Sequence, residues 1–123
     1  LNGCTNDGTD GIHVEYAGTY NYQFSVQLKN ADTQIHSAWI WLRKNGTDIA
    51  GTGSKFDVTS SHGGTPGFVI AAANFYVQLA ANDYIELYWT TDGGNSVLLS
   101  YPPGVSPVHP VSPAVIFTAN QIA

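Results

Sequence analysis

The chain has 123 residues and a mass of 13.1 kDa, which fits a single domain and leaves no room for a second core of ordinary size. Hydrophobic residues make up 43% of it, enough for a sizeable core, whereas charged residues make up only 11%. The net charge of −5, with four Lys and Arg residues, excludes the basic surface that nucleic acids and anionic membranes require, and no apolar run reaches the roughly 20 residues of a membrane span.

The N-terminal residues 1–11 are rich in Gly and Asn, so we expect a loop there, or the remnant of an excised first strand. Because the chain lacks Met and begins at Leu1, we expect it to be a processed piece of a longer product. Cys4 is the single cysteine, so no internal disulfide can form. Asp7 and Asp10 lie in a turn-rich stretch, as in calcium loops, but further oxygen ligands at fixed spacing are missing. The sequence therefore predicts no cofactor, with a calcium ion at this stretch as the alternative.

Residues 12–123 read as one all-β domain. Strict alternation of apolar and polar residues predicts a strand at 18–29 with one face in a core. Residues 35–45 and 68–81 are apolar on both faces in their middles, which is typical of strands buried on two sides. The pair Asn45-Gly46 is a strong hairpin signal, because both residues tolerate a positive φ. Further strands are predicted at 47–50, 55–59, 84–91, 96–101 and 114–122.

The connections between these strands carry the usual turn residues. Residues 60–67 form a polar, Gly-rich loop, and residues 101–113 hold all but one of the six prolines. Proline cannot donate to a ladder, so the second segment is predicted to be an extended loop and not a strand. About nine short strands with turns at this spacing indicate a two-sheet antiparallel sandwich.

Four segments in this order resemble the jelly-roll superfamily of the complement globular head and tumour necrosis factor. They are Gly18-Thr19-Tyr20 with Phe24–Leu28, then Trp39–Gly46, then Val77–Leu79 with Asn82–Leu87, and finally Val115-Ile116-Phe117. In the family the last of these strands lies beside the first strand, and Asn82 stands where the hairpin usually has Gly. The residue sequences of these segments also resemble domains in structural proteins of tailed phages, where such modules are fibre knobs or capsid decorations.

The resemblance implies a threefold homotrimer in which one sheet packs on its neighbours, and the strands with two apolar faces favour the same assembly. The predicted trimer interface consists of Trp39, Ile40, Ile70, Ala72, Asn74, Tyr76 and Phe117. Besides its own copies, the expected partners are other virion proteins and a glycan or protein of the host surface. The expected location is the surface of a virion; the alternative is a secreted or cell-surface recognition domain of bacterial or eukaryotic origin.

No constellation of residues predicts catalysis. The histidines are scattered without metal spacing, at His13, His36, His62 and His109, and no nucleophile has a local signature. We therefore expect a chain that binds or assembles and is not an enzyme. If a ligand site exists, the loops at one end of the sandwich are the expected place for it, with the side chains of Tyr101, Val105 and His109 as candidates.

Overall fold

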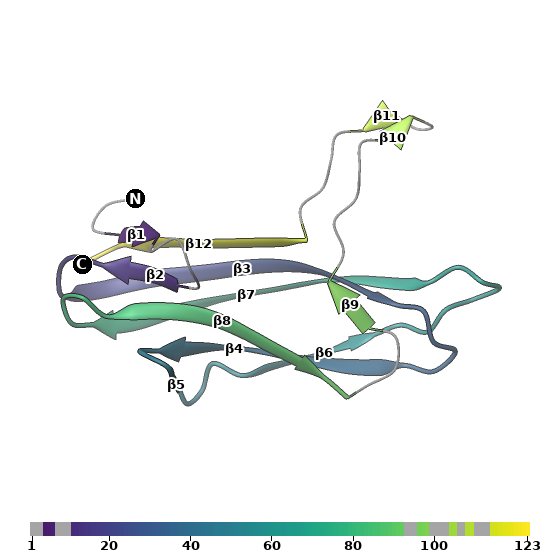
Figure 1. Ribbon diagram of the computed structural model, residues 1–123, viewed down its shortest axis with the longest axis horizontal. Coiled ribbons are helices and arrows are strands. Elements are labelled where there is room, and N and C mark those ends of the chain that lie inside the picture. The colour runs from purple at the N-terminus through teal and green to yellow at the C-terminus, as the bar shows by residue number, and fades with distance from the viewer. Residues whose placement is uncertain (1–3, 7–10, 93–95, 99–103, 106–107, 110–113) are drawn as a thin grey trace.

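A computed structural model describes residues 4–6, 11–92, 96–98, 104–105, 108–109 and 114–123 (Figure 1). These residues form strands and no helix, so none of them belongs to a helix that could span a membrane. Two antiparallel sheets face each other, which confirms the prediction of an all-β, two-sheet domain.

The strands are β1 (Cys4–Asn6), β2 (Gly11–Val14), β3 (Gly18–Asn30), β4 (His36–Lys44), β5 (Thr47–Asp48), β6 (Ser54–Val58), β7 (Gly67–Leu79), β8 (Tyr84–Thr91), β9 (Ser96–Leu98), β10 (Gly104–Val105), β11 (Val108–His109) and β12 (Val115–Gln121).

One sheet has the order β1-β2-β8-β4-β5, with β6 also paired to β4. The other has the order β12-β3-β7, with β9 also paired to β3. All of these pairings are antiparallel. The pair β10–β11 forms a small ribbon of its own, which stands clear of the sandwich in Figure 1.

The core lies between the two sheets and follows from the period-two patterns. In β3 the apolar side chains from Tyr20 to Leu28 are all buried, and the polar residues between them face outward. Ala38, Ile40 and Leu42 of β4 meet them from the opposite sheet and have no exposed surface. Burial of such side chains stabilises the fold by roughly 1.5–3 kcal/mol each relative to an exposed position.

Two turns have the positive φ angles that their residues predict. Asn45 and Gly46 join β4 to β5 with φ values of 52° and 84°, the left-handed pair that a two-residue hairpin loop requires. Asn82, in the turn between β7 and β8, has a φ of 72°, so Asn serves there in place of the usual Gly.

The structure corrects two expectations. The segment 1–11 is not all loop, because Cys4–Asn6 pairs with β2 in register from Cys4–Val14 to Asn6–Ile12. The proline-rich segment 101–113 contains β10 and β11, whose paired residues all lie between the prolines and keep their N–H donors. The last strand, β12, pairs with β3 and also contacts β1, which pairs with β2.

Candidate interaction surfaces and a histidine clasp

The outer face of the β12–β3–β7 sheet, which we call the β3 face, carries almost no charge. In β7 every second side chain is exposed, and the cross-strand neighbours on β3 and β12 point the same way. Its members are Phe68, Ile70, Ala72, Asn74, Tyr76 and Gln78 of β7, Asn21, Gln23, Ser25, Gln27 and Lys29 of β3, and Ile116, Thr118 and Asn120 of β12. Lys29 is the single charged residue among them.

Large apolar side chains on this face surround a hollow of small ones. Ile70 and Tyr76 are 66% and 64% exposed, and Ile116 is 50% exposed. Between them lies a shallow depression of about 350 Å³, whose floor includes Ser25 and Ala72. The face therefore offers both projecting side chains and a recess that can receive one.

Four of the residues predicted for the trimer interface share this face, namely Ile70, Ala72, Asn74 and Tyr76. The other three do not lie on it. Phe117 belongs to the same sheet but packs inward against the core, and Ile40 is fully buried in the core. Trp39 is exposed, but on the outer face of the opposite sheet. The seven residues therefore do not share one face, because apolar residues on both faces of β4 do not place β4 in the same sheet as β7.

The outer face of β4, β8 and β6, which we call the β4 face, has a different chemistry. Trp41 lies opposite Tyr88, and their ring centroids are 6.1 Å apart. The Arg43 guanidinium carbon lies 3.9 Å from the centroid of the Tyr88 ring, a cation–π contact. Asp48 accepts hydrogen bonds from Trp41 Nε1 and Arg43 Nε, both at 2.7 Å. These two donors, Arg43 first, lower the pKa of Asp48.

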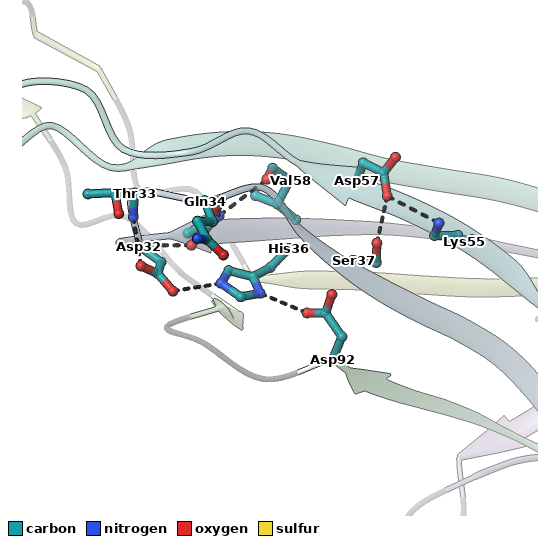
Figure 2. A network of polar contacts seen from close by, with 10 residues as sticks. Asp32, Thr33, Gln34, His36, Ser37, Lys55, Asp57, Val58 and Asp92 are labelled. Carbon is teal, nitrogen blue, oxygen red and sulfur yellow. Dashed lines mark hydrogen bonds and ion pairs between the residues drawn. The ribbon is translucent and has the colours of Figure 1, made fainter.

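A similar group surrounds Trp39 further along the same strand. Lys55 Nζ lies 5.9 Å from the centroid of the Trp39 ring and 3.7 Å from Asp57 Oδ1. Ser37 Oγ donates a hydrogen bond of 2.7 Å to the same carboxylate (Figure 2). Aromatic rings, cations and carboxylates thus share one sheet face.

Where the sandwich ends near β4, His36 is held between two carboxylates, an arrangement that we call the His36 clasp (Figure 2). His36 Nε2 lies 2.6 Å from Asp32 Oδ2, and Nδ1 lies 2.9 Å from Asp92 Oδ1. Asp32 belongs to the connection from β3 to β4, and Asp92 directly follows β8. The clasp therefore ties three segments together at the start of β4.

Backbone geometry places both carboxylates. The buried Asn30 side chain donates to the carbonyl oxygens of Gln34 and Val58, and its Oδ1 accepts the N–H of Asp32. Asp92 is aligned by its own N–H, which donates to Ser37 O at 3.0 Å. Both acids are therefore set by hydrogen bonds that do not involve the imidazole.

Both ring nitrogens can donate only when the imidazole is protonated, because a neutral imidazole carries one N–H. The hydrogen bond to Asp32, followed by that to Asp92, accordingly raises the pKa of His36. The hydrogen bond from His36 lowers the pKa of Asp32, and a backbone hydrogen bond from Ser37, followed by the His36 ring, lowers that of Asp92. The clasp therefore favours the protonated imidazole.

The two carboxylates also bind opposite nitrogens of the ring, so they do not converge on one point with it. Within the part of the chain that the structure describes, no group of three His, Cys, Asp or Glu side chains is arranged to hold a metal ion. Asp7 and Asp10, the residues of the calcium alternative, lie outside the described residues.

No protein-family model and no curated protein sequence matches the chain. The function is therefore inferred from the two sheet faces and the His36 clasp.

The remaining candidates from the sequence are placed as follows. Tyr101 lies outside the described residues, and the backbones of Val105 and His109 pair with Val108 and Gly104. His13 stacks on Tyr84 with centroids 5.1 Å apart, and the backbone of His62 bridges to Thr65.

Sequence reasoning missed the His36 clasp and the polar partners of the β4 face. The spacing of Asp32 and His36 was a signal for half of the clasp. No sequence signal pointed to Asp92, because only the pairing of β4 with β8 brings this residue close to His36.

Proposed function

We propose that the chain is a non-catalytic module of a tailed-phage virion that assembles as a homotrimer through its β3 face, as a fibre knob or capsid decoration, and contacts the host surface. The observation that carries the trimer is the β3 face, where Ile70, Tyr76 and Ile116 are at least half exposed on a surface with one charged side chain. Large apolar side chains exposed on a surface with so little charge favour an interaction site.

A second copy of the same chain is the occupant that this face fits best. Copies of a surface that bears one cation at its margin approach each other without accumulating like charges, and the recess at Ser25 and Ala72 can receive a projecting side chain of a neighbour. Charged residues are depleted from the cores of such interfaces. The low content of charge in the whole chain, 11%, agrees with a surface that is partly covered.

The finer fold assignment, a jelly roll of the tumour necrosis factor type, is supported by the strand order. Successive long strands alternate between the sheets: β3 is followed by β4 in the opposite sheet, and β7 by β8. The segments that resemble the family lie on β3, β4, β7, β8 and β12. The virion setting rests on the resemblance of these segments to phage structural domains.

Light scattering after size exclusion tests the assembly. The expected mass is three times 13.1 kDa. Ile70→Arg and Ala72→Arg each place a charge without a partner in the proposed interface, at a cost of several kcal/mol, and should yield a folded monomer. Thr90→Arg, an exposed position on the β4 face, is the matched control and should leave the mass unchanged.

A wild-type chain that stays at 13.1 kDa up to about 100 μM would contradict the trimer, because stable assemblies bind well below that concentration. Contact with a host is tested separately, by retention of the fluorescently labelled protein on whole bacterial cells. A trimer that no bacterial cell retains contradicts the adhesion role and leaves a structural one.

A further inference from the structure

The β4 face holds aromatic rings in a row, of which Trp39 is exposed and Trp41 and Tyr88 are half-buried. Trp39 and Trp41 are two residues apart on β4, so their positions are separated by about 7 Å on the same side of the sheet. Tyr88 lies beside Trp41 on β8, with the ring planes inclined by 30°. Trp39 is 36% exposed although it lies in the middle of a paired strand. The face thus presents two neighbouring aromatic positions, the exposed Trp39 and the half-buried Trp41–Tyr88 pair with Arg43 over the Tyr88 ring.

Each aromatic position is flanked by one cation and one carboxylate. Lys55 and Asp57 accompany Trp39, and Arg43 and Asp48 accompany the Trp41–Tyr88 pair. The side chains of Asp48 and Asp57 are each 61% exposed, so their outer oxygens remain open to further donors. The same unit of ring, donor and acceptor occurs twice along one strand.

We propose that the β4 face binds a neutral oligosaccharide, with one sugar ring on Trp39 and another on the Trp41–Tyr88 pair. A pyranose has a face of C–H groups that packs on an aromatic ring and a rim of hydroxyls that both donate and accept. Carboxylates accept from such hydroxyls, and Lys and Arg donate to them. Ligand sites generally combine apolar and aromatic contact with a few placed polar groups.

The charges favour a neutral saccharide over an anionic one. The two cations are already paired with carboxylates, at 2.7 Å for Arg43–Asp48 and 3.7 Å for Lys55–Asp57. An acidic sugar would therefore meet two exposed carboxylates and no unpaired cation in these two groups, on a chain with a net charge of −5. Hydroxyl groups avoid that repulsion.

The inference rests on the proposed contact with a host surface and gives it a chemical class, but it does not require the trimer. In the proposed assembly the β3 face is covered, and the β4 face belongs to the opposite layer of the sandwich and stays accessible.

The test is calorimetric titration of the full chain with hexasaccharides of β-1,4-glucose, β-1,4-xylose, α-mannose and N-acetylglucosamine, with hexagalacturonate as the anionic comparison. At least one neutral hexasaccharide should bind with a Kd below about 1 mM, and hexagalacturonate at least about tenfold more weakly. Trp39→Ala should weaken the neutral ligand by about tenfold, whereas Trp39→Tyr should retain most of the affinity. Thermal unfolding of both variants shows that they are folded.

Ile70→Ser, on the β3 face, is the matched control and should leave the Kd unchanged. Light scattering on the same samples reports the assembly separately, so loss of the trimer and loss of saccharide binding are distinguishable. The proposal is overturned if no neutral hexasaccharide binds below the millimolar range, if hexagalacturonate binds best, or if folded Trp39→Ala retains the wild-type Kd.

Discussion

Gly67 stands at the start of β7, pressed against the residue that follows β6. A Cβ atom on Gly67 would clash with the backbone carbonyl oxygen of Thr59 and lie 2.5 Å from its Oγ1. No side chain fits there unless one of the two backbones moves. The requirement comes from a contact between the first residue of β7 and the connection that follows β6, and not from the φ angle of the glycine.

We therefore expect Gly67→Ala to lower the free energy of unfolding by about 2 kcal/mol or more, as overpacking against rigid backbone does. Gly53→Ala is the matched control, because nothing lies within 4 Å of its Cβ position and its φ is not in the left-handed region. That substitution should leave stability unchanged or raise it by up to about 1 kcal/mol. Urea unfolding of both variants measures the difference; equal losses would contradict the steric argument.

Asn45 has two structural roles, of which only the first could be predicted from the sequence. Its turn was predicted from the Asn-Gly pair alone. Its side chain also bridges to the neighbouring hairpin, where Nδ2 donates to Asp83 Oδ1 at 2.8 Å and Oδ1 accepts the N–H of Tyr84 at 3.0 Å. The hydrogen bond from Asn45, followed by that from the Ala80 backbone, lowers the pKa of Asp83. The turn could be predicted from two adjacent residues. The bridge could not, because it forms only when β4 pairs with β8.

Among the elements, the His36 clasp gives the fold a defined pH response. The pKa of His36 is raised above its ordinary value of 6.5, so its contribution to stability is fully present below pH 6.5 and is lost as the pH rises through the higher folded-state pKa. The pKa values of Asp32 and Asp92 are lowered from 3.8, so their contributions are present above pH 3.8 and are lost as the pH falls through the lower folded-state values. The clasp is therefore strongest between these limits.

The thermal midpoint should accordingly fall as the pH is raised above 6.5, and His36→Gln should remove most of that fall, because glutamine does not titrate. His62→Gln, in the exposed loop after β6, should keep the wild-type dependence. Differential scanning fluorimetry between pH 4 and about pH 9 provides the comparison. A profile that His36→Gln leaves unchanged would show that the clasp does not couple protonation to folding.

The strands themselves were largely predictable, because period-two alternation directly reports which residues share a face. In β3 the predicted faces match the observed burial, whereas β7, which was predicted to be buried on two sides, has every second side chain exposed in the single chain. The sheet to which a strand belongs is not encoded in that pattern. Both faces of β4 read as apolar, and only the structure shows that Ile40 faces the core while Trp39 joins a polar, aromatic outer face. β1 was missed because three paired residues are too few to alternate visibly.

For the whole molecule, the two outer faces of the sandwich divide the surface chemistry. The β3 face is uncharged apart from Lys29, and the β4 face carries aromatic rings with paired cations and carboxylates. Such a division suits a domain that joins its own copies through one layer and meets other molecules through the other. Composition predicts that part of the surface is covered, and the sheet order shows which face carries little charge.

If copies join through the β3 face, stability must depend on protein concentration, because assembly stabilises the folded state by mass action. For a trimer that unfolds to monomers, a tenfold rise in concentration adds roughly 1 kcal/mol per protomer, and the thermal midpoint should rise by about 3–5 °C. Ile70→Arg, whose side chain is exposed in the single chain, should abolish this dependence without disturbing the core. Scanning calorimetry from about 5 to 500 μM spans two decades of concentration, over which this rise can be measured. A midpoint that is the same at both ends of that range would mean that the β3 face stays open to solvent, and the trimer proposal would then be wrong even if the chain folds as a sandwich.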